Sequence, residues 1–373
     1  MSSREIDEKV ERLERMLADN DIDAIILNAQ HNFAWLTAGG NNGVDTSREN
    51  GVASLAVTRD GKRFVIANSI EMERILDEQI AGSEFEPMEF AWQDEKADPR
   101  IGIEKLRRVI GSSGVMASDI PLVADVAAVE GKVAACRYVL TTEEIERYSL
   151  LGADAAAAMG CVIQKLEQAD SESEIAEKIR HELGTNGMTS VVTLVAVDER
   201  ITKYRHPVPT DRRFERTALL VTCAKRQGLI ASLSRMVSIG SPSDDLAART
   251  ESAAKVHAAL LAATRPGATG KQLYAAAAKA YDAAGLAGEI NLHHQGGATG
   301  YRTRDWVAHP ASDDVIREGQ AFAWNPSITG TKVEDTHILT SEGMQLITAS
   351  EIVPTITTTI EGREYHSPGI VQI

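Results

Sequence analysis

The sequence predicts two domains, an α/β domain at the amino-terminal end and a larger α+β domain in the rest of the chain. In the first part, short helical periodicities alternate with short apolar strands. From Leu140 the composition changes to long alanine-rich helices followed by a series of strands, so we place the domains at residues 1–139 and 140–373. A chain of 373 residues with 43% hydrophobic residues is long enough to form both cores.

The first domain is predicted to open with a helix and a strand. Residues 5–20 have helical periodicity, and residues 24–27 are a short apolar run typical of a buried strand. The dipeptide Asp60-Gly61 lies between two apolar segments and is a strong signal for a β-hairpin. The hairpin strands are expected at residues 52–58 and 63–67, further helices at 71–79 and 101–110, and further strands near 85–90 and 122–124.

The second domain is predicted to open with two capped helices. Thr141 or Thr142 can cap the first helix with a glutamate near its third position, and residues 171–173 begin a second helix with an acidic first turn. The first cap places the start of a helix where the composition changes. The remaining elements are expected as helices at 243–263 and 270–284 and as strands at 191–197, 320–324, 331–339 and 352–360.

Composition and charge exclude several classes of protein. No stretch of about 18 apolar residues is present, and the first fifteen residues are charged where a secretory signal is apolar, so we expect a cytoplasmic protein. Cys136, Cys161 and Cys223 have no paired spacing, which is typical of a reducing compartment. A net charge of -15 without a basic run makes nucleic acid and anionic membranes poor partners.

Residues 218–237 predict a β-hairpin, because two alternating apolar segments flank the turn residues 225–228. This segment resembles the metal-site hairpin of the pita-bread family, which contains creatinase, prolidase, aminopeptidase P and methionine aminopeptidase. In that family two aspartates of the hairpin hold a pair of metal ions. When Gly228 and Arg235 are placed on the matching glycine and arginine, Val221 and Ser232 stand at the two aspartate positions.

The resemblance implies a fold for each domain. For residues 140–373 it implies helices packed on a curved, mostly antiparallel sheet. For residues 1–139 it implies, more loosely, a creatinase-like amino-terminal domain, because the segment HNFAWLTAGG is similar to the start of that domain.

Three later segments match further ligand positions of the family. HHQGG places His294 at the histidine ligand, AFAWNPSI places Asn325 at a bridging glutamate, and KVEDTHIL keeps Glu334 as the final glutamate. Only two of the five ligands therefore remain, and they cannot offset the charge of two divalent ions. We expect no cofactor and no pair of metal ions. Tyr301 stands where prolidase and aminopeptidase P place a second catalytic histidine.

A single ion stays possible as an alternative. Cys223 lies two residues from Val221 and points to the same face of its strand, and a set of Cys223, His294 and Glu334 would suit zinc. The competing interpretation of Cys223 is a small buried hydrophobic residue.

The remaining pattern resembles creatinase, the member of the family that cleaves a C–N bond without a metal ion. The segment YRHPVPT places His206 at the creatinase acid/base position, and a histidine can exchange protons near neutral pH when a carboxylate orients it. Glu334 is the candidate for that carboxylate or for a group that binds a cationic substrate. Of the neighbours His293 and His294, only His294 has the matching position. Ser234 replaces a further creatinase glutamate, so the substrate is not implied.

Several residues are candidates for substrate binding. Arg302 and Arg304 fall close to a creatinase arginine that grips the substrate carboxylate, and Arg48 could form a second clamp that reaches a neighbouring subunit. The alternative for each is an exposed loop charge. The resemblance also implies a homodimer in which one amino-terminal domain covers the pocket of the other subunit. The remaining candidates for substrate contact are Tyr301, Ser232, Asn325 and Cys223, whereas His309, His337 and His366 are expected to be structural.

Three functions compete. The first is a metal-independent hydrolase that cleaves a C–N bond of a small carboxylate-bearing substrate, with His206 as general acid/base. The second is a metal-dependent Xaa-Pro peptidase or prolidase, and the third is an inactive pita-bread domain that serves as a binding module. The first predicts that His206, His294 and Glu334 converge on one pocket.

Overall fold

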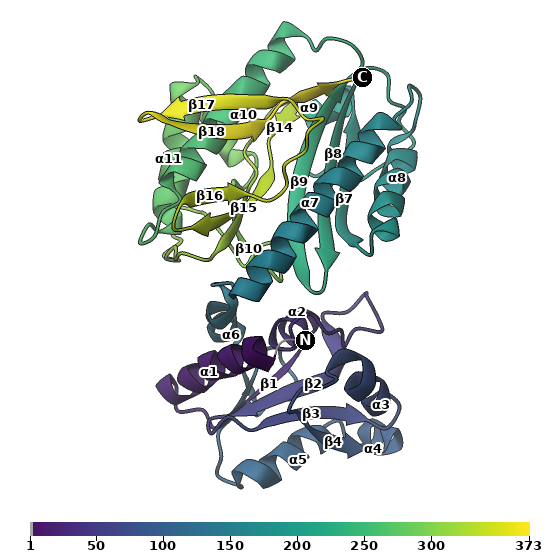
Figure 1. The fold of residues 1–373 in the computed structure, drawn as a ribbon, viewed down its shortest axis with the longest axis vertical. Coiled ribbons are helices and arrows are strands. Elements are labelled where there is room, and N and C mark those ends of the chain that lie inside the picture. Colours follow the sequence, from purple (N-terminus) through teal and green to yellow (C-terminus); the bar gives the residue numbers. More distant parts are fainter. Residues whose placement is uncertain (1–2) are drawn as a thin grey trace. The chain divides into compact units, whose positions relative to one another are not determined.

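The computed structural model describes residues 3–373, and the chain forms two compact units, one up to Tyr138 and one from Val139 to Ile373 (Figure 1). The assignment of residues 1–139 as a creatinase-like domain and of residues 140–373 as a catalytic domain stays a prediction. No helix in residues 3–373 is long and apolar enough to cross a membrane.

The first unit is built on a six-stranded mixed sheet with the strand order β4-β3-β2-β1-β5-β6. The antiparallel pairs are β1–β2 and β2–β3, and the other pairs are parallel. One core cluster joins apolar residues of these strands to α5. The bounds are α1 Ser3–Asp19, β1 Ala24–Ala29, α2 Gln30–Leu36, β2 Asn50–Thr58, β3 Arg63–Asn68, α3 Met72–Arg74, the π-helix η1 Ile75–Gln79, β4 Glu86–Phe90, α4 Trp92–Ala97, α5 Ile101–Ile110, β5 Met116–Ser118, β6 Ala127–Ala128 and α6 Glu130–Arg137.

The strand predicted near residues 122–124 is wrong. Leu122 and Val123 are apolar because they pack against the core of the first unit, and they do not pair with a strand. The chain enters the sheet before and after this segment, as β5 and β6. The α4 helix was not predicted, because its six residues include four charged or amide side chains and bury none.

The second unit contains two main sheets, ordered β19-β9-β8-β7 and β11-β10-β12-β15-β16, and two small hairpins, β13–β14 and β17–β18. All pairs are antiparallel except β19–β9, which confirms the predicted α+β, mostly antiparallel fold. The bounds are α7 Thr142–Gln164, α8 Glu172–Thr185, β7 Thr189–Val197, α9 Glu199–Lys203, β8 Thr217–Arg226, β9 Leu229–Ser238, α10 Asp244–Ala263, α11 Gly270–Ala283, the 3-10 helix η2 Ala287–Asn291, β10 Gly296–Thr299, β11 Trp306–Val307, β12 Ala321–Trp324, β13 Ser327–Ile328, β14 Thr331–Lys332, β15 Asp335–Thr340, β16 Gly343–Leu346, β17 Thr355–Ile360, β18 Arg363–Pro368 and β19 Ile370–Gln372.

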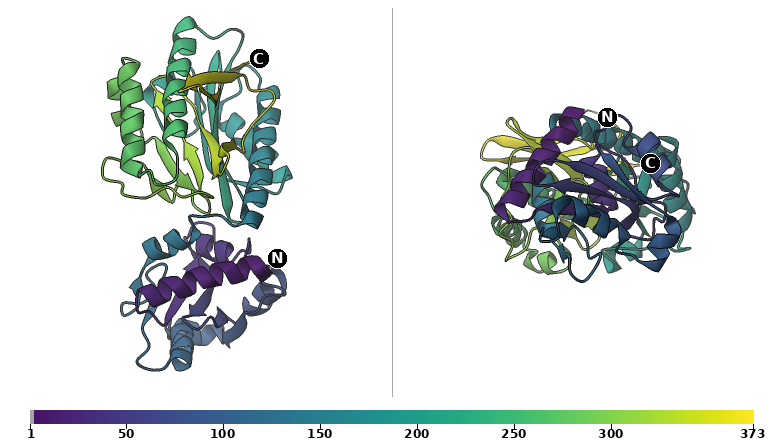
Figure 2. Two further views of the ribbon diagram at one scale, coloured as in Figure 1. Left: turned by 60° about the vertical axis from the view of Figure 1, so that its left-hand side comes forward. Right: turned by 90° about the horizontal axis from the view of Figure 1, so that it is seen from below.

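Capping boxes fix the starts of the two helices that pack on the β7–β8–β9 strands. The Thr141 hydroxyl accepts the Glu144 N–H of α7, and the Ser171 hydroxyl accepts the Glu174 N–H of α8. Each glutamate returns a hydrogen bond to the cap residue, so two unpaired donors are satisfied at each helix end. Figure 2 shows the other helix pair of this unit, α10 and α11, lying side by side in green.

The predicted hairpin forms as β8 and β9 with a turn shorter than expected. Gln227 and Gly228 alone make the turn, with φ angles of 50° and 82°. Two positive φ angles are typical of the tight turn that matches strand twist. The register places Cys223 opposite Ser232 and Val221 opposite Ser234.

The strand predicted at residues 331–339 is broken into β14 and β15. Glu334 lies at the break and forms an isolated bridge with Ser234 of β9. This bridge joins the two main sheets of the second unit, and it places the Glu334 carboxylate against the β8–β9 hairpin.

Candidate active site

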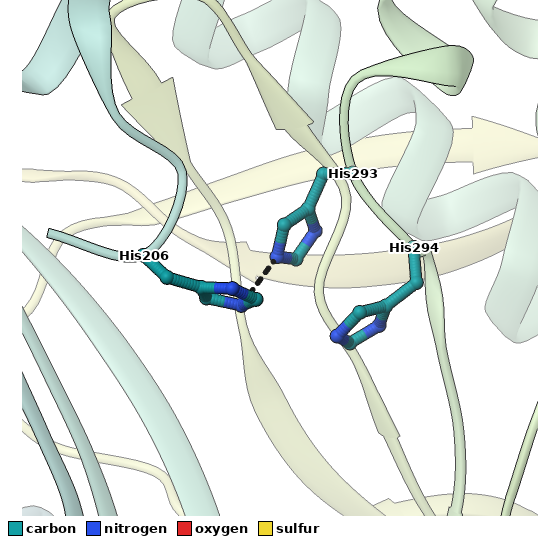
Figure 3. A group of neighbouring side chains, drawn as sticks. All are labelled: His206, His293 and His294. Carbon is teal, nitrogen blue, oxygen red and sulfur yellow. Dashed lines mark hydrogen bonds between the residues drawn. The ribbon is translucent and has the colours of Figure 1, made fainter.

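Three histidines from two loops of the second unit meet beside the sheets (Figure 3). His206 lies in the loop between α9 and β8, whereas His293 and His294 precede β10. His206 Nε2 lies 3.0 Å from His293 Nε2, and the His293 and His294 rings stack with centroids 4.4 Å apart. One donor nitrogen from each histidine lies within 4.8 Å of the others.

The loop that carries His206 is anchored on both sides of the histidine. Arg205 forms an ion pair with Glu289 and donates to Thr329 Oγ1. The carbonyl of Pro207 accepts the N–H of Val195 in β7. These contacts hold the backbone at His206 while its side chain stays exposed.

The loop that carries His293 and His294 is held by its close approach to β12. Gln295 donates to the carbonyl of His293, and the N–H of Gly296 donates to His294 Nδ1 at 3.2 Å. Gly296 has a φ of 97°, and a Cβ at this position would lie 2.1 Å from the carbonyl oxygen of Ala323. Only glycine therefore fits here, and this close contact sets the position of both histidines.

Burial keeps the histidines neutral. It lowers the pKa of His293 to about 2, and the charge of Lys332 adds to this shift. It lowers the pKa of His294 to about 4, and the charges of Arg304 and Lys332 add to that shift. Burial, followed by the charge of Lys332, also lowers the pKa of His206. Each imidazole therefore has a lone pair at neutral pH.

A buried ionic group lies next to the hairpin. Glu334 accepts from Arg304 Nη2 at 2.8 Å, Lys332 Nζ at 2.9 Å and Ser234 Oγ at 2.5 Å. Burial alone would raise the pKa of Glu334, but Lys332 and Arg304 outweigh it and hold that pKa well below its usual range. The group contains two cations and one anion, so its net charge is positive.

Three of the predicted substrate-binding residues, Ser232, Cys223 and Arg304, lie at this ionic group. Ser232 Oγ donates to Cys223 Sγ at 3.2 Å and accepts from Arg304 Nη1 at 3.3 Å. Asn325 lies beside the histidine loop in the fold, since its backbone N–H donates to the carbonyl of Gln295. The Asn325 Oδ1 atom is buried and has no hydrogen-bond partner among residues 3–373.

The other three predicted substrate-binding residues, Tyr301, Arg302 and Arg48, have surroundings that differ from those of the ionic group. The Tyr301 hydroxyl donates to Glu144 Oε1 in the first turn of α7, so this hydroxyl is used at the helix start. Arg302 is exposed. Arg48 belongs to the first unit and forms an exposed ion pair with Asp45, with 3.0 Å between Nε and Oδ2. Substrate contacts of these three residues stay predictions.

The structure adds two residues to the predicted site. Glu334 was the candidate either to orient His206 or to bind a cationic substrate; its oxygens contact Lys332, Arg304 and Ser234, and it is His293 that contacts His206. Lys332 and His293 were not predicted as site residues. The basic residue at the start of the KVEDTHIL segment was the available signal for Lys332, and the adjacent histidine pair was the signal for His293.

The convergence of His206, His294 and Glu334 on one pocket stays a prediction. The three histidines gather with one another, and the side chains of His206 and His294 are exposed in the single chain. Glu334 belongs to the neighbouring ionic group and acts on the histidines through its charge.

The family's pair of metal ions does not fit the residues present. Val221 packs in an apolar cluster with Leu219 and Met236, and it has no donor atom. Glu334, the remaining carboxylate, already pairs with both Arg304 and Lys332. Two divalent ions would add positive charge beside Arg304 and Lys332. At the other glutamate position of the family, Asn325 offers a neutral oxygen in place of a carboxylate.

The alternative zinc set of Cys223, His294 and Glu334 is not supported either. Among the described residues, the donor atoms that gather at metal-binding distances belong to the three histidines. Burial raises the pKa of Cys223, and the thiol contacts Ser232. Cys223 therefore matches the competing interpretation, a small buried side chain.

The sheets, the flanking helices and the β8–β9 hairpin define a protein of the pita-bread fold. Residues 148–348, more than half of the 373-residue chain, match the metallopeptidase family M24, and the chain belongs to this family of hydrolases. The predicted family is thereby confirmed.

Two relatives that are similar in sequence are Xaa-Pro dipeptidases. The chain is 26% identical to that of Pyrococcus furiosus over 225 residues, which cover 58% of this chain and 64% of the relative. It is 26% identical to that of Pyrococcus horikoshii over 204 residues, which cover 52% of this chain and 58% of the relative. Each match thus spans less than two thirds of the relative's length.

Solved structures show the same fold at low sequence identity. The Xaa-Pro dipeptidase from Bacillus anthracis has a TM-score of 0.76 and 21% identity, and the match covers 92% of this chain and 97% of that chain. The amino-terminal domain of the FACT complex subunit SPT16 from Cicer arietinum has a TM-score of 0.72 and 13% identity, with 93% and 97% covered. The fold therefore occurs both in dipeptidases and in a subunit of a larger complex.

Proposed function

We propose that this M24 protein is a hydrolase that cleaves a C–N bond of a small carboxylate-bearing substrate by proton transfer at His206, without the family's pair of metal ions. The observation that carries the proposal is the contact between His206 Nε2 and His293 Nε2 at 3.0 Å. It gives an exposed histidine a fixed ring orientation, which an ordinary surface histidine lacks.

The exposure of the two rings assigns their roles. His206 is exposed and can exchange a proton with water or substrate, whereas His293 is 8% exposed and serves as its positioning partner. His206 takes a proton from water as the water oxygen bonds to the substrate carbon. The same proton is then delivered to the leaving nitrogen as the C–N bond breaks, so the histidine ends in its starting state.

The ionic group supports a substrate that carries a carboxylate. Arg304 and Lys332 outnumber Glu334 by one charge, and the Arg304 side chain retains some exposure. The buried Nε atom of Arg304 has no hydrogen-bond partner among the described residues. An anionic group would balance the excess charge of Arg304 and Lys332, and a guanidinium binds a carboxylate in a fixed geometry.

The exposure of His206 and His294 supports a second subunit as cover. A C–N hydrolase works best in an enclosed site from which bulk water is excluded. In a homodimer, as predicted from the resemblance, the amino-terminal domain of one subunit would cover the histidines of the other and bring Arg48 near the substrate.

A binding module is the second candidate, and a specific observation favours it. The fold matches the amino-terminal domain of a FACT complex subunit over most of both chains, and Val221, Ser232 and Asn325 replace three metal ligands of the family. A metal-dependent Xaa-Pro dipeptidase, as in the named relatives, has less support because the donor set for two ions is incomplete.

One assay separates the three functions. The protein is dialysed against a chelator and tested on N-amidino, N-carbamoyl and N-acyl amino acids and on Xaa-Pro dipeptides. Turnover without added metal supports the proposal. Turnover of Xaa-Pro dipeptides that appears only with added manganese or cobalt supports the dipeptidase, and saturable binding without turnover supports the binding module.

A further inference from the structure

We propose that His206, His293 and His294 bind one divalent transition-metal ion of the zinc or cobalt class, and that this ion inhibits the hydrolase. The inhibition rests on the proposed function, because an ion on His206 occupies the lone pair that accepts the proton. The binding itself rests only on the described histidines.

The geometry of the cluster is close to that of a metal site. The donor atoms of the three histidines lie within 4.8 Å of one another, and two of them are 3.0 Å apart. Three nitrogens on one tetrahedral ion lie roughly 3.3 Å apart, given Zn–N bonds of about 2.0–2.1 Å. The exposed side chain of His294 can make the remaining adjustment by rotation, whereas His293 is buried and orients His206 through the contact between their Nε2 atoms.

The chemistry of the donors also suits such an ion. Three imidazoles are preferred ligands of zinc and cobalt and leave a fourth position for water or a substrate oxygen. A neutral imidazole is the form that binds such an ion, and it offers one lone pair per ring. Metal binding through His294 Nε2 would require the tautomer that gives up the 3.2 Å contact from the N–H of Gly296.

The surrounding charges set the character of the site. Lys332 and Arg304 weaken the binding of a cation, and Glu334 offsets only one of them. An anion in the fourth position, such as hydroxide or a substrate carboxylate, would reduce the excess positive charge. We therefore expect a reversible ion that a chelator removes.

The proposed site differs from the family's metal pair. Of the five positions that the resemblance assigns to that pair, the histidine cluster contains only His294. His206 and His293 come from outside those positions. One ion per chain, held by nitrogen ligands, is therefore the expected stoichiometry.

The test is a titration of chelator-treated protein with Co²⁺, followed by visible absorption. Saturation at one equivalent per chain, with the strong absorption of a four-coordinate ion that added Zn²⁺ abolishes, is the expected result. His206→Ala, His293→Ala and His294→Ala should each weaken binding by about 10-fold or more. His366→Ala, which removes an exposed histidine of β18, is the matched control and should leave binding unchanged.

Thermal unfolding of each variant checks that the fold is retained. His206→Asn is a second variant for the exposed loop, should His206→Ala unfold. Absence of the absorption band, saturation at two equivalents, or equal binding by the three variants and the wild-type protein would each overturn the site.

Turnover with and without one equivalent of Co²⁺ tests the inhibition separately. A fall in turnover on loading supports it. A rise on loading overturns the inhibitory role and leaves the site standing. Binding without turnover in either state contradicts the proposed function and again leaves the site standing.

Discussion

His206 Nε2 and His293 Nε2 lie 3.0 Å apart although the two residues are separated by 87 positions in the sequence. One nitrogen has to donate and the other has to accept, so the protonation of either ring fixes the tautomer of the other. His293 is buried and its ring stacks on that of His294, so these contacts fix its orientation. The contact therefore couples His206, the exposed candidate for proton transfer, to His293, whose ring is held in place by burial.

The first prediction concerns the role of His206. His206→Asn keeps a side chain of similar size and polarity but removes the group that accepts a proton. On a substrate found in the assay above, we expect kcat to fall by about 100-fold or more, the usual size of a general acid/base contribution. His309→Asn, a change at an exposed histidine, is the matched control. A folded His206→Asn protein with full turnover would show that another group moves the proton.

The structure shows which parts of this site a sequence can predict. The alternation in residues 218–237 and the caps at Thr141 and Ser171 are local signals, and these elements formed as expected. His293 became important through a contact with a distant loop, which no local periodicity encodes.

Lys332 shows a second limit of prediction from sequence. A lysine is almost never fully buried unless it is paired. Lys332 is 5% exposed because it pairs with Glu334. The two residues meet where the strand is interrupted between β14 and β15, whereas the sequence predicted one continuous strand there. Its place in the site followed from burial and pairing, which only the folded chain shows.

The second prediction concerns the stability supplied by the ionic group. Glu334→Gln removes the negative charge and leaves Arg304 and Lys332 buried without a counter-charge. We expect a loss of about 3–5 kcal/mol in the free energy of unfolding, as is typical when one partner of a buried pair is removed. Denaturant unfolding followed by tryptophan fluorescence measures it.

Two comparisons sharpen this measurement. Glu342→Gln changes an exposed glutamate in the same way and should leave the stability unchanged. The double variant Glu334→Gln with Lys332→Met removes one buried cation as well and should recover part of the loss. A loss below about 1 kcal/mol for Glu334→Gln, the size seen for exposed pairs, would contradict the prediction.

The third prediction concerns the pH dependence of stability through Glu130 of the first unit. Burial alone would raise the pKa of Glu130, but the hydrogen bond from His31 and the charge of Arg137 outweigh it and lower the pKa from 4.5 to about 2. The lower pKa in the folded state means that the ionised form stabilises the fold above pH 4.5, and that this stability is lost as the pH falls towards 2.

Glu130→Gln removes this titrating group. We expect the unfolding midpoint of the variant to fall less steeply than that of the wild-type chain between pH 4.5 and 2. Glu84→Gln, at an exposed position of the same unit, should keep the wild-type slope. Identical slopes for Glu130→Gln and the wild type would exclude Glu130 as the source of the pH dependence.

The last prediction concerns the assembly that would enclose the histidines. His206 and His294 are exposed in one chain, and a small substrate needs a covered site, so we expect a homodimer of twice the 40.3 kDa chain mass. If Arg48 of one subunit helps to grip the substrate of the other, Arg48→Ala should raise KM and leave kcat nearly unchanged, because it would remove binding in both ground and transition states. Arg213→Ala, at another exposed arginine, is the control. Light scattering that gives about the mass of one chain at micromolar concentration would contradict the dimer, and an unchanged KM for Arg48→Ala in a proven dimer would remove Arg48 from the site.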